Sequence, residues 1–384
     1  MMVKPLFVDV HVLQTVPPSN INRDDTGSPK SARFGGVKRA RVSSQAWKKA
    51  TRDLFPVLLE QNEIGQRTKH AVDMIANYVL EAKSDIDREQ AIKAAEKALS
   101  ATGISVKDEV TSYLLFVAPG QAKRLAELAV QSIESGESVD KKAAKEILDI
   151  KKNPLLNAVD VAMFGRMVAD APDLNVDASV QVAHAIGIGK MEPEFDYFTA
   201  LDDRSPEDNA GAAMIETTEF ASSTMYRYAN IDVYHLCQNL GSAQVACRGI
   251  KAFLQSFATS MPTGKQNSFA NRTLPATVVI QLRDTQPVSL VNAFEKPVEA
   301  HGGKSQVEIG CERLLTQEKA VDEAFETTPQ NTFVVIASPD AKALAGMTSE
   351  SGTEACSLKE AVGKVSLLCA RYLEANGYQS EQED

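Results

Sequence analysis

The sequence lacks the patterns that most often indicate a catalytic or metal site. Its five cysteines are odd in number and no two form a C-x-x-C pair, so we expect reduced, mostly buried thiols. Its five histidines are scattered, and none lies three or four residues from another. No G-x-S-x-G, H-E-x-x-H or Walker A motif is present. We therefore expect no catalytic residue, no metal and no cofactor.

Long apolar runs are also missing. No stretch approaches the roughly eighteen apolar residues that a membrane helix needs. Residues 1–13 contain no apolar core followed by a small-residue cleavage site, which predicts a cytoplasmic protein. The chain has 384 residues, of which 43% are hydrophobic and 24% charged. This predicts a soluble chain of two or three domains, or one domain with large insertions.

The distribution of charge is more informative than its sum. A net charge of −10 argues mildly against nucleic-acid binding. The window from Gly27 to Arg52, however, contains no acidic residue and eight basic ones: Lys30, Arg33, Lys38, Arg39, Arg41, Lys48, Lys49 and Arg52. A basic segment on an acidic chain indicates a surface for a polyanion, although a solvated basic loop would have the same composition.

Within this window the sequence predicts a helix with two different faces. Ser43 or Ser44 can cap a helix that runs to about Leu54. One face carries Gln45, Lys48, Lys49 and Arg52, and another carries Trp47, Ala50, Leu54 and Phe55. One side of the helix can therefore pack while the other holds phosphates, helped by the free N–H groups at its N-terminus.

The remaining elements predict an α+β fold. Alternating residues from Leu6 to Thr15 predict a strand, and a polar loop follows from Pro17 to Ala32. Residues 60–152 are helical in character. Further strands are expected at Asn157–Phe164, Glu216–Ile231, Thr277–Leu282 and Thr332–Ala337, with helices at Ser242–Ser260 and Leu358–Ala375. Without the helical insertion, this order is compatible with a β-α-β-β-α-β, RRM-like (ferredoxin-like) unit.

Several smaller features have a structural reading, and three of them also have a functional one. Asp24 and Asp25 could hold a catalytic metal, or cap a turn and pair with Arg23. The aromatic pair at 197–198 could stack on bases or pack in the core. At 166–167, the arginine could contact phosphate and the methionine could wedge against a base, or they could be a salt-bridged arginine and a buried methionine. His184, between two alanines, is expected to be a partly buried ring, and the acids at 202–203 a solvated loop.

A series of short motifs resembles one known family. The N-terminal set consists of NRDD at 22–25, FGG at 34–36, Lys38, Arg39, Arg41, SSQ at 43–45 and Lys48. It continues with GRM at 165–167, HAI at 184–186, FTA at 198–200, DD at 202–203, EF at 219–220, YRYA at 226–229, KQ at 265–266 and NAFEK at 292–296. Their order, from residue 5 to about 298, is similar to that of CasC-type backbone subunits of type I-E Cascade, a CRISPR RNA-guided complex.

The resemblance implies an architecture. It implies an RRM-like palm made of residues 1–60 and 156–384, a helical fingers insertion at 61–155, and a protruding thumb hairpin at 190–217. It also implies a non-catalytic subunit that lines up in several copies along one CRISPR RNA. Its partners would be further copies of itself, other Cascade subunits, target DNA paired with the guide, and a separately recruited helicase–nuclease.

The resemblance also implies site residues. Contacts with RNA phosphates are implied for Arg23, Ser43, Gln45, Lys48 and Lys49, with Arg52 one turn further along, and Lys265 is a further candidate. Met167 and the segment Tyr197, Phe198 and Thr199 would lie at a displaced nucleotide. With Lys38, Arg39 and Arg41 from the charge pattern, and Arg166 beside Met167, these residues form the predicted RNA-binding set. The alternative hypotheses are a metal-dependent RNA endonuclease that uses Asp24 or Asp25, and a small-molecule enzyme built on the same fold.

Overall fold

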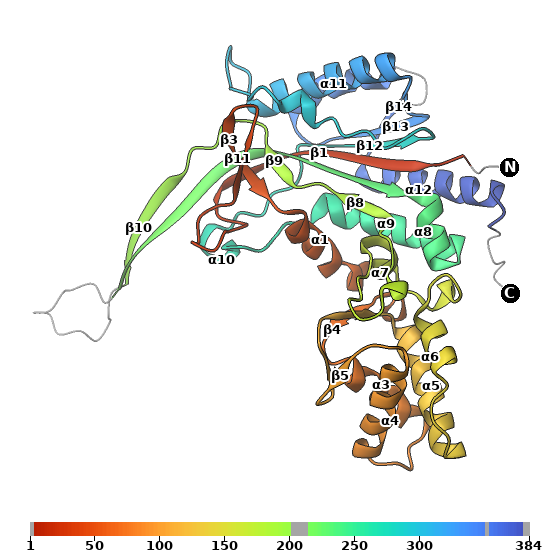
Figure 1. Ribbon diagram of the computed structural model, residues 1–384. Helices are drawn as coiled ribbons and strands as arrows, with labels where there is room; N and C mark the ends of the chain where they lie inside the picture. The colour runs from red at the N-terminus through yellow and green to blue at the C-terminus, as the bar shows by residue number, and fades with distance from the viewer. Residues whose placement is uncertain (1–3, 201–213, 350–352, 379–384) are drawn as a thin grey trace, which may run out of the picture.

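The computed structural model describes residues 4–200, 214–349 and 353–378. Figure 1 shows three parts: a sheet body with helices on both faces, a helical arm below it, and a two-stranded ribbon that projects to the left. The sheet body contains both described ends of the chain. No described helix combines the length and the apolar character needed to cross a membrane.

The sheet body is built on one mostly antiparallel sheet. Its strands are β1 (Phe7–Ser19), β2 (Ser31–Phe34), β3 (Val37–Val42), β8 (Val180–Val182), β9 (Ala185–Gly187), β10 (Glu194–Ala200), β11 (Met214–Asp232), β12 (Thr277–Arg283), β13 (Asn331–Ile336) and β14 (Thr353–Ala355). The main order is β14-β13-β12-β1-β11-β9-β3-β2, and β8 and β10 also pair with β11. Among the strands that the structure describes, β13 and β14 alone pair in parallel.

The helices complete the expected α+β fold. In the sheet body they are α1 (Ser44–Asp53), α2 (Phe55–Leu58), α7 (Val159–Phe164), α8 (Val233–Leu240), α9 (Ala243–Thr259), α10 (Gln266–Phe269), α11 (Gln306–Phe325) and α12 (Leu358–Ala375), with 3₁₀ turns η2 (Pro154–Leu156), η4 (Val291–Phe294) and η5 (Pro339–Ser349). A further 3₁₀ turn, η3 (Pro172–Leu174), packs with the arm. Strand β1 lies between β11 and β12, with α1 following β1 and α9 connecting β11 to β12. In chain order, β1, α1, β9, β11, α9 and β12 follow a β-α-β-β-α-β order, in which β9 takes the place of the strand predicted at Asn157–Phe164.

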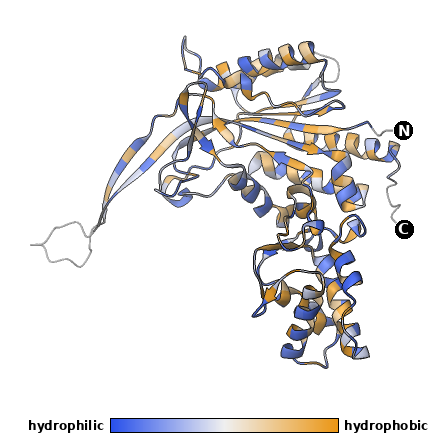
Figure 2. Cartoon of the chain, viewed as in Figure 1, coloured by the Kyte–Doolittle hydropathy of each residue, from blue (hydrophilic) through white to orange (hydrophobic). Residues whose placement is uncertain are grey.

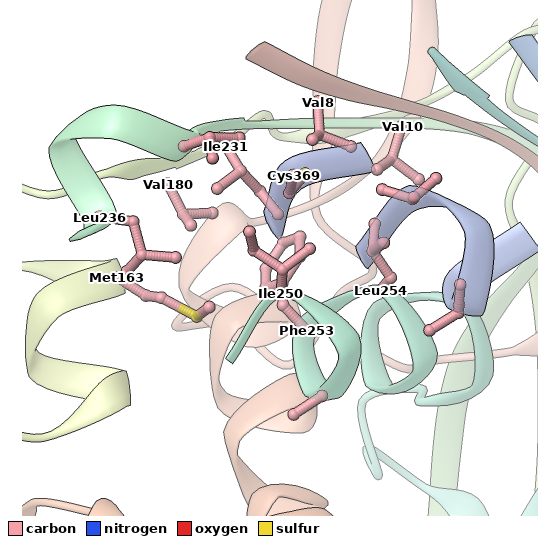
Figure 3. Close-up of a cluster of buried hydrophobic side chains, with 14 of the residues drawn as sticks. Val8, Val10, Met163, Val180, Ile231, Leu236, Ile250, Phe253, Leu254 and Cys369 are labelled. Atoms are coloured by element: carbon pink, nitrogen blue, oxygen red, sulfur yellow. The ribbon is translucent and has the colours of Figure 1, made fainter. Parts of the chain in front are cut away.

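Strand β1 shows how the sheet separates two layers. Val8, Val10 and Val12 occupy every second position of β1 and lie on the side of α9 and α12, where they join a large apolar cluster (Figure 3). Leu13 points to the opposite layer and packs with residues of η4 and α11, among them Phe294. Because side chains alternate along a strand, the two-residue period of the sequence places both sets of apolar contacts in the core.

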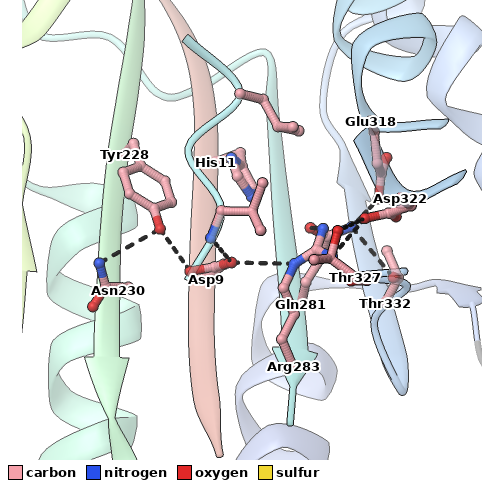
Figure 4. Close-up of polar contacts among 12 residues, drawn as sticks. Asp9, His11, Tyr228, Asn230, Gln281, Arg283, Glu318, Asp322, Thr327 and Thr332 are labelled. Atoms are coloured by element: carbon pink, nitrogen blue, oxygen red, sulfur yellow. Dashed lines mark hydrogen bonds and ion pairs between the residues drawn. The ribbon is translucent and has the colours of Figure 1, made fainter. Parts of the chain in front are cut away.

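The layer under α11 also contains a buried polar network (Figure 4). The Asp9 carboxylate accepts a hydrogen bond from the Tyr228 hydroxyl at 2.7 Å and lies 3.2 Å from Nε of Arg283. Arg283 also pairs with Asp322 at 2.7 Å. Burial raises the pKa of Asp9 to about 6 and lowers that of His11, whose Nδ1 is 2.9 Å from the Tyr226 hydroxyl, to about 3. These groups tie β1, β11 and β12 to the helix above them.

The helical arm has its own core. It contains η1 (Gln61–Glu63), α3 (Ala71–Ala82), α4 (Arg88–Ala101), α5 (Pro119–Ser135), α6 (Lys141–Leu148) and two short strand pairs, β4 (Gln66–Thr68) with β7 (Leu115–Val117) and β5 (Val106–Lys107) with β6 (Val110–Thr111). Hydrophobic and polar segments alternate along its helices (Figure 2). Val168, Ala171 and Leu174 belong to the arm's core, so the arm continues past residue 155.

Several predicted elements are confirmed and others are corrected. Strands β1, β11, β12 and β13 and helices α9 and α12 lie where the sequence predicts them. The expected strand at Asn157–Phe164 is wrong, because Val159–Phe164 forms helix α7. The polar loop after β1 is followed by a hairpin, β2–β3, that the sequence does not predict, and α11 is also new.

Candidate nucleic-acid interface

Helix α1 forms as the sequence predicts. The Ser43 hydroxyl accepts a hydrogen bond from the Ala46 N–H at 3.3 Å and caps the helix. The Asn22 side chain accepts a hydrogen bond from the Ser43 N–H at 2.9 Å, which joins the preceding loop to the helix start. Trp47 is buried against the body, whereas Gln45 is exposed. One face of α1 is therefore fixed in the core and the opposite face is open to a ligand.

The three cations of the predicted α1 face differ in their surroundings. Lys49 is exposed and pairs with Asp53 at 2.7 Å, a surface pair of the kind that contributes little to stability. Arg52 pairs at 2.9 Å with Asp160 of α7, which is fully buried. Lys48 is half-buried, with its amine 5.7 Å from the centre of the Phe164 ring. No carboxylate among the described residues forms an ion pair with Lys48.

The Arg52–Asp160 pair connects the body to the arm. Asp160 also accepts a hydrogen bond from the Gly65 N–H at 2.7 Å. Burial raises the pKa of Asp160, and the Arg52 charge opposes that shift. The Arg52 guanidinium lies 4.6 Å from the centre of the Phe116 ring in β7. Arg52 is thus an anchor between α1, α7 and the arm, and its charge is already matched.

The loop before β2 is held by its own acidic residue. The Asp24 carboxylate accepts hydrogen bonds from the Thr26 N–H at 3.0 Å, the Thr26 hydroxyl at 2.7 Å and the Ser28 N–H at 3.0 Å. These bonds, led by that of the Thr26 hydroxyl, lower the pKa of Asp24. Arg23 and Asp25 are exposed beside it. Asp24 therefore has the geometry of a residue that caps a turn. Among residues 4–200, 214–349 and 353–378, no group of three or more potential metal ligands occurs.

The hairpin β2–β3 presents some of its cations and buries one. Arg33 and Lys38 are exposed. Arg41 lies with its Nη1 3.0 Å from Nδ1 of His184. His184 is exposed rather than partly buried as expected, and its pKa is lowered by partial desolvation and by the nearby charges of Arg41 and Lys30. Together these side chains form a cationic edge beside the loop before β2 that Asp24 caps, which we call the capped loop.

Arg39 is corrected from an RNA contact to an internal brace. It is fully buried, and its guanidinium donates to the carbonyls of Gly187, Ile188, Phe294 and Glu295 at 2.7–3.0 Å. Burial lowers its pKa. A guanidinium that donates to four backbone carbonyls inside the protein cannot reach a phosphate in this conformation. Its role is to hold the hairpin against the body.

Arg166 is corrected in the same way, while its neighbour is open. Arg166 is buried and donates to the carbonyls of Leu148 and Leu174 and to the Gln121 side chain at 2.6–3.1 Å. Burial lowers its pKa to about 10. Met167, the next residue, is 82% exposed. An apolar side chain so exposed beside a fixed arginine is available to contact a base or another protein.

The ribbon β10–β11 carries exposed aromatic rings on both faces. Tyr197 pairs with Thr217 across the ribbon and is 64% exposed, and Phe198 pairs with Glu216 and is 39% exposed. Thr199 is also exposed, and Phe195 lies on the Tyr197 face at 68% exposure. Since β11 continues into the centre of the sheet, the ribbon is an extension of the core strand next to β1. The acids at 202–203 lie outside the described residues.

Lys265 lies next to the loop that follows β1. It has a φ of +51° at the start of α10 and is half-buried. The preceding glycine, Gly264, packs so closely on the backbone of Ile21 that an added Cβ would lie 2.4 Å from its carbonyl oxygen. This contact brings Lys265 to the loop that carries Arg23, although the two lie far apart in the sequence.

The sequence matches the family model described as "CT1975-like protein" from residue 8 to residue 364. This chain belongs to the CT1975-like family. Among solved structures, the CT1975-like chain is similar to a chain of a "CRISPR RNA-guided surveillance complex, pre-nicking", with a TM-score of 0.79 and 29% identity over 94% of this chain and 100% of that one. A chain of a "CRISPR RNA-guided surveillance complex" has a TM-score of 0.67 and 26% identity over 93% of this chain and 99% of that one. No curated protein matches the sequence.

The structure of this CT1975-like chain also reveals residues that the sequence reasoning missed. Asn22 joins its loop to the cap of α1, and Asp160 anchors Arg52. Arg67, in β4 of the arm, approaches Lys48 of α1 closely enough that its charge lowers the pKa of Lys48, after the larger effect of burial. The available signal for Arg67 was a single arginine in a segment expected to be an insertion, and nothing in the sequence indicated that this segment faces α1.

Proposed function

We propose that this CT1975-like chain is a CRISPR RNA-binding backbone subunit of a Cascade surveillance complex, of the type I-E CasC kind. In this function it holds the guide RNA by its phosphates and displaces bases at regular intervals, which leaves the other bases free to pair with target DNA. It has no catalytic role of its own.

One observation carries this proposal. The chain aligns over nearly its whole length, at 29% identity and a TM-score of 0.79, with a chain whose structure is titled a CRISPR RNA-guided surveillance complex. A match that covers 94% of this chain and all of the other spans the sheet body and the helical arm together. It therefore supports a shared role better than a match to the sheet alone would.

The surface of the body supports contact with a nucleic-acid backbone. Gln45 and Lys48 on α1, Arg23 in the capped loop and Arg41 on β3 supply donors and positive charge. Contacts to phosphates carry no sequence information, so such a surface can hold a guide of any sequence. The exposed Tyr197 and Phe198 rings offer stacking surfaces for unpaired bases, which also do not depend on sequence.

The partners of the proposed function follow from the same assignment. The RNA partner is the CRISPR RNA, and further copies of this chain would line up along it beside the other Cascade subunits. Target DNA would be held through base pairing with the guide. Cleavage would belong to a separately recruited helicase–nuclease.

The alternative, a metal-dependent RNA endonuclease using Asp24 or Asp25, has less support. The Asp24 carboxylate is engaged by three hydrogen bonds from its own loop. The distinguishing experiment is incubation of labelled RNA with the protein and Mg²⁺. We expect intact RNA with wild type, Asp24→Ala and Asp25→Ala, and metal-dependent cleavage that disappears in either variant would favour the nuclease.

The proposal is tested by RNA binding across a salt series, measured by fluorescence anisotropy with a labelled single-stranded RNA. We expect Lys48→Glu to weaken binding and to make the negative slope of log K against log salt shallower, because each phosphate contact contributes about −0.7 to that slope for a single strand. Lys359→Glu, an exposed lysine of α12, is the charge-matched control and should bind as wild type does. Arg52→Glu is unsuitable, since it would leave Asp160 buried without its cation.

A further inference from the structure

Arg67 occupies the edge of the helical arm that faces helix α1. It is exposed on β4 and lies directly across from Phe116 of β7 in the strand register. Its guanidinium is 5.2 Å from the centre of the Phe116 ring, and the Arg52 guanidinium is 4.6 Å from the same centre. The arm therefore brings a cation of its own to the place where α1 presents two.

The charges at this junction do not balance. Lys48, Arg52 and Arg67 bring three positive charges around the rings of Phe116 and Phe164. The facing carboxylate, Asp160, is bound by Arg52 and by the Gly65 N–H. No carboxylate within the described ranges forms an ion pair with Lys48 or Arg67. Two positive charges thus remain unmatched where the body meets the arm.

Such an arrangement favours a bound anion. Lys48 is half-buried, so water screens its repulsion from Arg67 less than it would at an open surface. An anion between the two groups removes that repulsion and supplies acceptors for both. An arginine presents a planar fork of N–H donors and a lysine a mobile ammonium, and phosphate oxygens accept from both.

We propose that Lys48 and Arg67 together bind one phosphate group of a nucleic-acid backbone between the sheet body and the helical arm. This inference rests on the proposed function and adds to it that the arm, and not only the body, holds the RNA. Gln45 lies on the same face of α1 and offers an amide to a neighbouring part of the backbone.

The position of the site has a mechanical consequence. Lys48 belongs to a helix packed in the body, and Arg67 to a strand pair whose neighbours pack in the separate core of the arm. A phosphate bound by both links these two cores. We therefore expect RNA binding to slow amide hydrogen exchange in β4 and β7 more than free inorganic phosphate does at matched ionic strength.

The experiment compares the full-length protein with three variants in the anisotropy salt series. Arg67→Gln removes the charge, and Arg67→Lys keeps the charge without the fork. Arg88→Gln is the matched control, because Arg88 is an arginine of the arm whose charge is already paired with Asp73 at 3.0 Å. We expect Arg67→Gln to bind RNA about ten-fold more weakly, with a salt slope shallower by about 0.7. We expect Arg67→Lys to keep the wild-type slope and Arg88→Gln to match wild type.

The possible outcomes distinguish a failure of the phosphate site from a failure of the proposed RNA-binding function. Wild-type protein that binds no RNA would overturn the proposed function, and the phosphate site with it. Wild-type binding with equal affinity and slope in Arg67→Gln and Arg88→Gln would overturn the phosphate site alone. If inorganic phosphate by itself protects β4 and β7, and Arg67→Gln removes that protection without changing RNA affinity, the site takes a free ion and the inference is wrong. A thermal melt of each variant is the folding control, and we expect unchanged melting temperatures because Arg67 is exposed.

Discussion

At the residue scale, the cations of the basic window fall into two groups with different surroundings. Lys38 and Lys49 reach solvent, whereas Arg39 donates to four backbone carbonyls inside the protein. The sequence could not separate these groups, because the partners of Arg39 are backbone atoms of residues near 187 and 294. Charge counting predicts a basic surface and not which of its arginines are internal braces.

We expect Arg39→Ala to lower the free energy of unfolding by roughly 3 kcal/mol, because the change leaves buried carbonyls without donors. Lys38→Ala, at the neighbouring exposed position, should lie within about 0.5 kcal/mol of wild type. Urea unfolding followed by circular dichroism measures both. An Arg39→Ala protein with wild-type stability and weakened RNA binding would contradict the role of a brace.

A second residue-scale prediction concerns His11. Burial lowers the pKa of His11 to about 3. Below about pH 6.5 the unfolded chain therefore binds a proton at His11 that the folded chain does not bind. The free energy of unfolding consequently decreases as the pH falls toward 3. His11→Gln removes this loss, and the stability of wild type relative to the variant should fall by up to about 1.4 kcal/mol per pH unit in that range.

Urea unfolding of both proteins at a series of pH values tests this prediction. Asp9, whose pKa is raised to about 6, acts in the opposite sense, because it contributes most stability at low pH and loses it as the pH rises through 6. The direct comparison at each pH largely cancels the Asp9 contribution. Parallel stability curves for wild type and His11→Gln would show that His11 titrates normally in the folded protein.

At the element scale, the sequence predicts those elements whose pattern is local. The alternation that begins at Leu6 predicts β1, and Ser43 predicts the start of α1. The hairpin β2–β3 escaped prediction because its strands are short and polar and its turn depends on two glycines. Gly35 has a φ of +57° and lies against the Glu295 backbone, a contact that only the folded chain contains. Helix α7 escaped because its β-branched valines favour a strand locally.

The ribbon gives the element-scale prediction. We expect Tyr197→Ala combined with Phe198→Ala to leave the melting temperature unchanged, because both rings are exposed. The same variant should lose the base-displacing contact. With 2-aminopurine in the RNA, wild type should raise the fluorescence at regularly spaced positions as those bases unstack, and the variant should not. Lys190→Ala, at the exposed start of the same region, serves as the control. Equal fluorescence in all three proteins would remove the ribbon from base displacement.

At the scale of the whole molecule, three parts each supply residues to the proposed RNA interface. The body supplies α1, the arm supplies Arg67, and the ribbon supplies aromatic rings on an extension of the central strand β11. The α+β fold could be predicted from the sequence, as could most of the α1 face. The junction between body and arm could not, because it depends on contacts between positions such as 48 and 67, and 52 and 160, that no local pattern records.

We expect the whole molecule to act as a repeating unit on RNA. The proposed phosphate contacts and the exposed ribbon suit a subunit that binds beside another copy of itself on one strand. The most direct measurement is the mass of the protein–RNA complex, by analytical ultracentrifugation or native mass spectrometry, over a series of RNA lengths. We expect the number of protein copies to rise in regular steps as the RNA lengthens. A single copy bound at every length, or a complex whose mass does not depend on RNA length, would contradict the proposed backbone role.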